Sequence, residues 1–194
     1  MTCRTLVGLA AVLAWSGAKA ADPRVEVLVE PQAVEDFTLT DQNGWLFRFD
    51  GLRDREALLF FGFTSCPNVC PAALFKLKLL TTMLEKAEQT VPAVVLVSVD
   101  GERDTPAVMK SYLSNYPDNF IGLTGDPKYV RKIAAGFKAV FFKGLPYDNA
   151  GNYQVDHTSL VYLVDAEGKI RASFLDAPVE AMAETTRQVV SRLH

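Results

Sequence analysis

The cysteines Cys66 and Cys70 are the residues whose type and spacing point most directly to chemistry. They lie in the segment 64–71 (TSCPNVCP), and their separation is about one turn of an α-helix. Two thiolates at this separation can bind a soft metal ion between their sulfurs, exchange with disulfides, or join as a disulfide themselves. One further cysteine, Cys3, lies close to the N-terminus.

The elements predicted around the pair place both thiols at the start of a helix. Residues 57–63 form an uninterrupted apolar run, which is typical of a central strand buried on both faces. Downstream, apolar residues recur at helical spacing between Leu74 and Ala87. A helix N-terminus offers unpaired N–H groups and a partial positive charge. We therefore expect this position to lower the pKa of the thiols and to favour the thiolate.

Several kinds of site are compatible with this cysteine pair. A purely structural disulfide would close so short a loop that it would add little stability, and thiol–disulfide exchange usually employs cysteines separated by two residues. A closed zinc site needs four protein ligands, which is more than the chain offers. Two thiolates with one imidazole suit copper, either as Cu(I) or as Cu(II). Copper binding is therefore the favoured interpretation.

Residues 1–20 have the composition of a secretory signal peptide. They carry Arg4 near the start, an apolar run over 6–15 and an Ala-x-Ala ending. The run is shorter than the roughly 20 apolar residues of a membrane-spanning helix. We therefore expect cleavage after Ala20 and export to the periplasm, with an uncleaved membrane anchor as the alternative. Residues 21–194 then form a single domain.

The charge of the exported part narrows the classes of partner. The full chain has a net charge of −3, and removal of a leader with two cations and no acids leaves −5. No basic stretch suits nucleic acid or an anionic membrane surface. The composition therefore favours proteins, metals or small molecules as partners.

The rest of the chain predicts an α/β domain. Residues 37–49 alternate around a turn at 41–44, as in a β-hairpin. Residues 22–31 and the stretch after Phe137 show no regular pattern. Further elements are predicted as strands at 94–99, 120–123, 160–164 and 169–174, and as helices beginning near Pro106, Pro127 and Pro178. Strands alternating with helices, then a closing hairpin and helix, indicate a thioredoxin-like sandwich, a mixed β-sheet flanked by helices with an N-terminal β-hairpin.

This fold class gives one of the two histidines a role. His194 is the last residue, whereas His157 precedes the strand predicted from Leu160. In thioredoxin-like folds the loop entering this strand faces the cysteine turn, and reducing enzymes usually carry a cis-proline there. The chain has a histidine in that region instead, which replaces a docking element with a metal donor. We expect His157 to lie beside the cysteines, with Asp156 as a residue that could orient it.

Four motifs stand in order along the chain, at residues 62–71 (GFTSCPNVCP), 98–105 (SVDGERDT), 122–125 (GLTG) and 155–158 (VDHT). With them the chain resembles the Sco (SenC-type) copper chaperone family, which assembles the dinuclear copper centre of respiratory cytochrome oxidase. The resemblance implies a thioredoxin-like fold and a copper site formed by Cys66, Cys70 and His157. It also implies a recipient cuproprotein, such as a cytochrome oxidase subunit.

The chain departs from the family pattern in two residues of these motifs. Asn68 stands between the cysteines, where the family commonly has Asp, and Gly101 stands where it commonly has Pro. Asn68 removes a negative charge beside the site, which would change copper affinity or the choice of partner. Many family members are tethered to a membrane, whereas the short leader predicts a released protein, for which a periplasmic copper enzyme is an alternative recipient.

The segment after the second buried strand is expected to lie near the cysteine turn, because the carboxyl ends of parallel strands share one edge of a sheet. Asp104 or Thr105 is predicted to cap the next helix, and Arg103 to pair with Asp100. The alternative role for Asp100 and Arg103 is to dock a partner.

Three functions follow in order of preference. The first is copper delivery by a binding protein rather than an enzyme, with other copper carriers or a periplasmic thiol reductant as further partners. In that case an oxidised protein with Cys66 bridged to Cys70 should not hold copper. The second is a thiol–disulfide reductase that keeps the copper-ligating cysteines of a partner reduced. The third is a thiol peroxidase, for which Arg103 is the candidate arginine.

Overall fold

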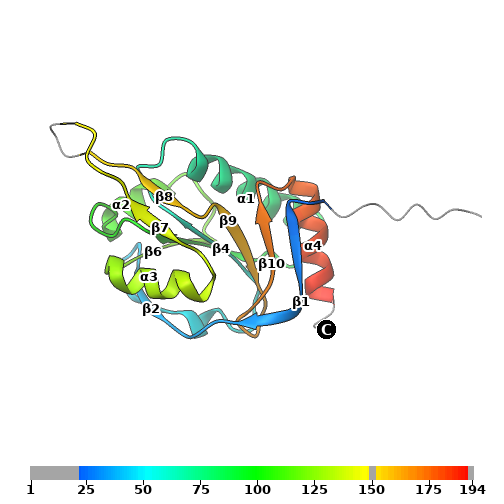
Figure 1. Cartoon of the computed structure of the whole chain (residues 1–194). Helices are drawn as coiled ribbons and strands as arrows, with labels where there is room; N and C mark the ends of the chain where they lie inside the picture. Colours follow the sequence, from blue (N-terminus) through cyan, green and yellow to red (C-terminus); the bar gives the residue numbers. More distant parts are fainter. Residues whose placement is uncertain (1–21, 149–151, 192–194) are drawn as a thin grey trace, which may run out of the picture.

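The computed structural model describes residues 22–148 and 152–191 (Figure 1). The predicted signal peptide at 1–20, with Cys3, and the terminal His194 lie outside these residues. Among the described helices, none combines the length and the apolar character needed to cross a membrane.

An eight-stranded mixed sheet forms the centre of the fold. The strand order is β1-β10-β9-β4-β5-β6-β2-β3, in which β4 pairs parallel with β5, and β5 with β6, while the other pairs are antiparallel. The strands are β1 (Val25–Ala33), β2 (Thr38–Asp41), β3 (Leu46–Arg48), β4 (Ala57–Gly62), β5 (Ala93–Ser98), β6 (Phe120–Thr124), β9 (Leu160–Val164) and β10 (Lys169–Leu175). The mixed α/β architecture predicted from the sequence is confirmed.

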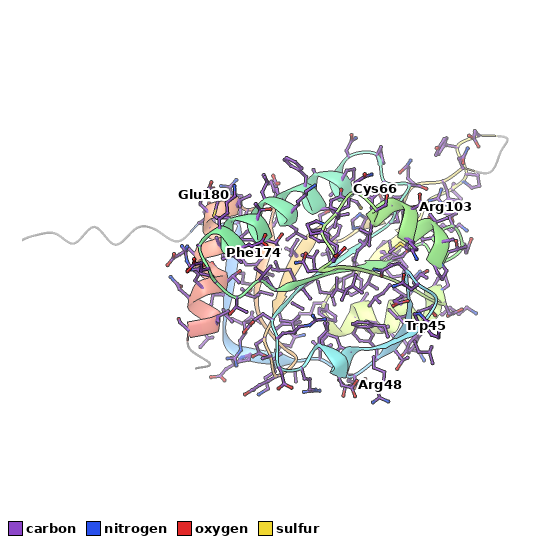
Figure 2. All side chains as sticks on the ribbon, turned by 180° about the vertical axis from the view of Figure 1, so that it is seen from behind. Trp45, Arg48, Cys66, Arg103, Phe174 and Glu180 are labelled. Atoms are coloured by element: carbon purple, nitrogen blue, oxygen red, sulfur yellow. The ribbon has the colours of Figure 1, made fainter. Side chains whose placement is uncertain are left out.

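Helices cover both faces of this sheet, with α1 over one face and α3 over the other (Figures 1 and 2). They are α1 (Val69–Lys86), α2 (Pro106–Leu113), α3 (Pro127–Gly136) and α4 (Val179–Ser191), with a short 3-10 helix η1 (Phe49–Leu52). α2 begins as predicted, because the Thr105 hydroxyl accepts a hydrogen bond from the Val108 amide and Pro106 follows. The Asp126 carboxylate caps α3 in the same way.

The two central strands bring the loops that follow them to one edge of the sheet. All six residues of β4 and all six of β5 are buried, which agrees with their continuous apolar sequence. Gly62, at the end of β4, pairs in parallel register with Ser98, at the end of β5. The segments that follow, 63–68 and 99–105, therefore leave the sheet side by side.

Two segments without a regular sequence pattern contain strands. Residues 22–31 were expected to be irregular, but β1 pairs antiparallel with β10 at the edge of the sheet. The stretch after Phe137 was also expected to be irregular, yet β7 (Phe141–Lys143) and β8 (Val155–His157) form a separate two-stranded sheet. His157 is therefore the last residue of a short strand and not a loop residue.

Candidate metal centre

The fold brings Cys66, Cys70 and His157 together. One sulfur or nitrogen atom from each residue lies within 4.8 Å of the others, and Cys70 Sγ is 3.5 Å from His157 Nε2. Within the described part of the chain, no second group of three or more such residues could hold a metal ion. The donors come from the loop after β4, the first turn of α1 and the end of β8, and Figure 2 shows Cys66 at this edge, near Arg103.

The start of α1 holds the two thiols in different environments. The Cys70 amide donates a hydrogen bond to Cys66 Sγ over 3.4 Å, so the first sulfur receives one of the unpaired N–H groups of the helix start. Cys66 is 9% exposed, whereas Cys70 is fully buried. The buried sulfur packs against the end of β4, where a Cβ atom on Gly62 would approach Cys70 Sγ to 2.9 Å. Glycine at position 62 thus makes room for the second thiol.

Burial reverses the expected electrostatics at the second cysteine. It raises the pKa of the Cys70 thiol well above its ordinary value, because a thiolate loses its hydration there. The prediction that the helix start lowers the thiol pKa is therefore wrong for Cys70. The protonated thiol can donate to His157 Nε2, which lies 3.5 Å away. A metal that binds this sulfur has to displace a proton.

Backbone and aromatic contacts orient the imidazole of His157. Its Nδ1 atom lies 3.1 Å from the Thr158 carbonyl oxygen, and because a carbonyl only accepts, Nδ1 carries the proton of this hydrogen bond. Nε2 then presents its lone pair to the cysteines. The rings of Phe60 and Phe63 pack edge-on against the imidazole, each with its centroid 5.8 Å away. Burial lowers the pKa of His157, which keeps the ring neutral and available as a ligand.

Asp156 acts on His157 through its charge rather than as the hydrogen-bond partner of Nδ1. Its side chain is exposed, and its negative charge opposes the effect of burial by raising the His157 pKa. The orienting group is the Thr158 carbonyl, which sequence patterns do not reveal because every residue has one.

A buried carboxylate anchors the loop that carries Cys66. Asp104 is fully buried and accepts hydrogen bonds from the Thr64 amide at 3.0 Å, the Thr64 hydroxyl at 2.5 Å and the Ser98 hydroxyl at 2.6 Å. Of the two predicted helix caps, Asp104 and Thr105, the cap is Thr105. Asp104 instead ties the cysteine loop to the end of β5.

We expect Asp104→Ala to destabilise the protein by about 3 kcal/mol, because three donors lose their acceptor and a buried donor without a partner costs about 1–3 kcal/mol. Urea denaturation of the reduced apoprotein measures this change. Asp118→Ala, at an exposed aspartate, is the matched control and should change stability by less than about 0.5 kcal/mol. Equal stability of the two variants would contradict the anchoring role of Asp104.

The predicted pair of Asp100 and Arg103 is confirmed. Arg103 Nε donates to the buried Asp100 carboxylate, and the Tyr153 hydroxyl donates to the same carboxylate at 2.6 Å. Gly101, between them, packs so closely on the neighbouring chain that a Cβ atom would lie 2.1 Å from the Gly125 carbonyl oxygen. Proline, the common family residue, would require a shift of this backbone.

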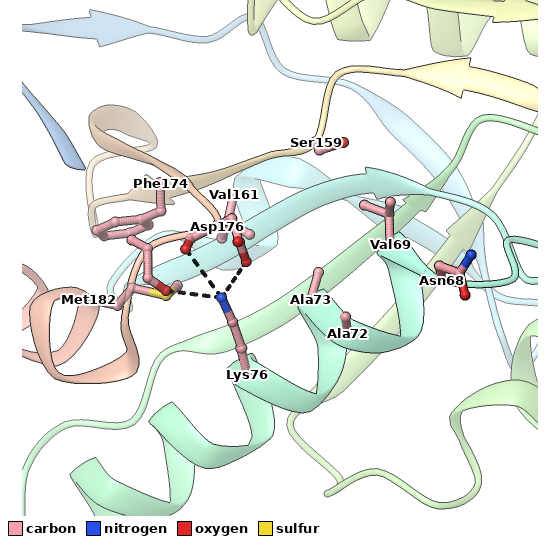
Figure 3. A pocket seen from close by; sticks show the side chains of 11 residues that line it. Asn68, Val69, Ala72, Ala73, Lys76, Ser159, Val161, Phe174, Asp176 and Met182 are labelled. Carbon is pink, nitrogen blue, oxygen red and sulfur yellow. Dashed lines mark hydrogen bonds and ion pairs between the residues drawn. The ribbon is translucent and has the colours of Figure 1, made fainter. Parts of the chain in front are cut away.

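A cavity of about 410 Å³ lies beside the candidate centre. Asn68 and Ser159 line it at the end near the ligands, and its walls are mostly apolar side chains of α1, β9 and α4. Figure 3 shows Lys76 reaching towards Asp176, with which it forms an ion pair. Asn68 is exposed and makes no side-chain cap to α1.

Comparisons with known proteins show the family and the fold of this chain. A family model described as SCO1/SenC matches residues 27–191. The SCO2-like protein of Rickettsia conorii is 38% identical over 153 residues, which cover 78% of this chain and 74% of the relative. The structure of Bradyrhizobium japonicum ScoI with copper bound has a TM-score of 0.70 and 37% identity, and covers 80% of this chain and 98% of that one.

The crystal structure of yeast Sco1 with copper bound has a TM-score of 0.76 and 29% identity, covering 83% of this chain and 90% of that one. These similarities confirm the thioredoxin-like fold predicted from the sequence. The match to the family model spans most of the chain. The alignment with the relative from Rickettsia has a similar length. The chain therefore belongs to the SCO1/SenC family.

Proposed function

We propose that this protein binds copper through Cys66, Cys70 and His157 and delivers it to a cuproprotein. The observation that carries the proposal is the convergence of two thiols and one imidazole nitrogen within 4.8 Å. The copper-bound structures of two relatives support copper as the metal. A subunit of cytochrome oxidase is the favoured recipient, and a periplasmic copper enzyme is the alternative.

The donor set suits both oxidation states of copper. Cu(I) is soft and is satisfied by two thiolates, whereas Cu(II) also prefers nitrogen donors. Cys66 and Cys70 would therefore hold either state, and His157 would complete the site chiefly for Cu(II). Cys66 is 9% exposed, so a recipient could reach the copper from the side of this residue.

Export would place the site where such recipients are loaded. The proposal rests on the composition of residues 1–20, which resembles a signal peptide. Cleavage after Ala20 would release the protein into the periplasm, and retention of the segment would leave it anchored. Other copper carriers would supply the metal, and a periplasmic thiol reductant would keep the cysteines reduced.

A second function, thiol–disulfide reduction of a partner's copper-ligating cysteines, is favoured by one observation. Cys66 and Cys70 are both free thiols, and the Cys70 amide donates to Cys66 Sγ, the more exposed of the two sulfurs. Thiol peroxidase activity has less support, because the Arg103 guanidinium is engaged by Asp100 and Tyr153.

Replacing His157 separates the two leading functions. We expect His157→Ala to keep Cu(I) bound between the two sulfurs but to lose the Cu(II) site, because the nitrogen donor is gone. Paramagnetic resonance should lose its nitrogen couplings, and the thiolate-to-Cu(II) absorption should disappear. Thiol–disulfide exchange with a small disulfide should stay near the rate of the parent protein.

His194→Ala is the matched control, since it removes the only other histidine, and it should leave every signal unchanged. A parent-like Cu(II) spectrum in His157→Ala would exclude the histidine as a ligand. A collapse of thiol–disulfide exchange with unchanged copper affinity would favour the reductase.

A further inference from the structure

The strand that carries His157 is not part of the main sheet. Among the described strands, β8 pairs only with β7, through the register pairs Phe141–His157, Phe142–Asp156 and Lys143–Val155. Backbone hydrogen bonds thus fix the two strands relative to each other but not relative to the cysteines. Two residues join His157 to β9, and contacts between this hairpin (strand residues 141–143 and 155–157) and the body of the domain therefore help to determine where the imidazole lies.

Arg103 holds the β8 side of the hairpin. Its Nη1 atom donates to the Tyr153 carbonyl at 3.1 Å, and its guanidinium lies 3.8 Å from the centroid of the Tyr153 ring. The Tyr153 hydroxyl in turn donates to Asp100, just after β5. Tyr153 is only 7% exposed, although it stands two residues before β8. The chain is thereby fixed to the end of β5 as it enters the strand of His157.

Arg131 holds the β7 side in the same manner. It extends from α3, and its Nη1 atom donates to the Phe141 carbonyl at 2.6 Å. Its guanidinium lies 4.5 Å from the centroid of the Phe141 ring, which is 3% exposed. Phe141 is the direct register partner of His157, so this contact acts on the residue opposite the proposed ligand.

Each contact uses a property that lysine lacks. A guanidinium is planar and can stack on an aromatic face while it donates to a carbonyl. We propose that Arg103 and Arg131 are positioning residues that hold the β7–β8 hairpin against the domain and thereby keep His157 within reach of Cys70. This inference rests on the proposed copper site. It implies that the two arginines support the Cu(II) site and contribute little to Cu(I) binding by the sulfurs.

Arg131→Leu is the cleaner test, because no carboxylate is paired with Arg131 among the ion pairs of the described residues. At the other contact, Asp100→Asn/Arg103→Leu removes both charges, so that no unpaired carboxylate stays buried. Loss of a group that orients a ligand lowers metal affinity by about 10–100-fold. We expect each variant to bind Cu(II) about 10-fold more weakly, with weakened nitrogen couplings and parent-like Cu(I) affinity in chelator competition.

A measurement on the metal-free protein supplies an independent readout. Amide hydrogen exchange over residues 153–158 should accelerate in reduced Arg131→Leu, because the hairpin loses an anchor. Arg131→Lys should restore only part of the protection, since lysine can donate but has no planar group to stack on the Phe141 ring. Arg48→Leu is the matched control, because Arg48 pairs with Asp50 and lies far from Cys66 and Arg103 (Figure 2).

Three results would overturn the inference. The first is parent-like Cu(II) couplings and hairpin exchange in both variants. The second is an equal loss of Cu(I) and Cu(II) affinity, which would indicate general damage to the site. The third is the same loss in Arg48→Leu. If His157→Ala itself kept the parent Cu(II) spectrum, the proposed copper site would fail, and this outcome is distinct from the other three.

Discussion

Replacing either cysteine by serine is expected to abolish copper binding in both oxidation states. The expectation follows from the chemistry of the donors, because Cu(I) depends on the two thiolates and Cu(II) uses them together with nitrogen. Loss of a group that merely orients a ligand lowers metal affinity by about 10–100-fold. Loss of Cys66 or Cys70 itself should exceed this range. Chelator competition with Cu(I) and the metal content of the purified protein measure the effect.

Ser65→Ala is the matched control for these variants. Ser65 is exposed and directly precedes Cys66, so its replacement tests the same loop without removing a sulfur. It should bind copper like the parent protein. If Cys66→Ser or Cys70→Ser kept the Cu(I) affinity of the parent, a different pair of donors would have to hold the metal.

Oxidation of the two thiols to a disulfide is expected to prevent copper binding. Formation of the S–S bond removes two protons and two electrons, which an added oxidant such as diamide accepts, and it leaves no thiolate to ligate copper. Cys66 and Cys70 are both free in the structure, and their sulfur atoms lie within 4.8 Å of each other. A disulfide needs a sulfur separation of about 2 Å, so closure requires a local movement of the loop.

Copper titration of the oxidised protein, before and after reduction, measures this dependence of copper binding on the redox state. The oxidised form should take up no stoichiometric copper, and the reduced form should recover full binding. A thiol count on each sample verifies the redox state. The same copper stoichiometry in fully oxidised and reduced protein would rule out Cys66 and Cys70 as the ligand pair.

The two thiols of the site lie in different environments. Cys66 accepts a hydrogen bond from the start of α1, whereas burial raises the pKa of Cys70. In the metal-free state the Cys70 thiol lies within hydrogen-bond distance of His157 Nε2. Copper binding would replace this internal contact with metal bonds and release the thiol proton, because a thiol ligates a metal as the thiolate.

Features that depend on local periodicity and residue type could be predicted from the sequence. A continuous apolar run identified β4, and helical spacing with cap residues identified α1, α2 and α3. The pair Cys66 and Cys70 was placed at a helix start because the strand and helix patterns adjoin it. Two sulfurs and one imidazole also indicated copper, since donor chemistry can be inferred from residue types.

Strands at the edges of the fold were missed for a physical reason. β1 has exposed and half-buried residues without a clear alternation, and it becomes a strand because β10 supplies its hydrogen-bond partners. β7 and β8 are each three residues long and depend on each other in the same way. Such segments follow from pairing with distant residues, which local sequence patterns do not encode.

The assembly of the site depends on contacts between segments that are distant in the sequence. The contact between Cys70 and His157 joins residues 87 positions apart, and the sequence predicted it only through the fold class and the family resemblance. The raised pKa of Cys70 reflects burial, which depends on how β4, α1 and β8 pack together. The hydrogen bonds from Arg103 and Arg131 to the chain at the β7–β8 hairpin likewise form only because the end of β5 and α3 pack against it. Residue types specify which donors are available. Packing between distant segments specifies the positions of those donors and the pKa values that burial gives them.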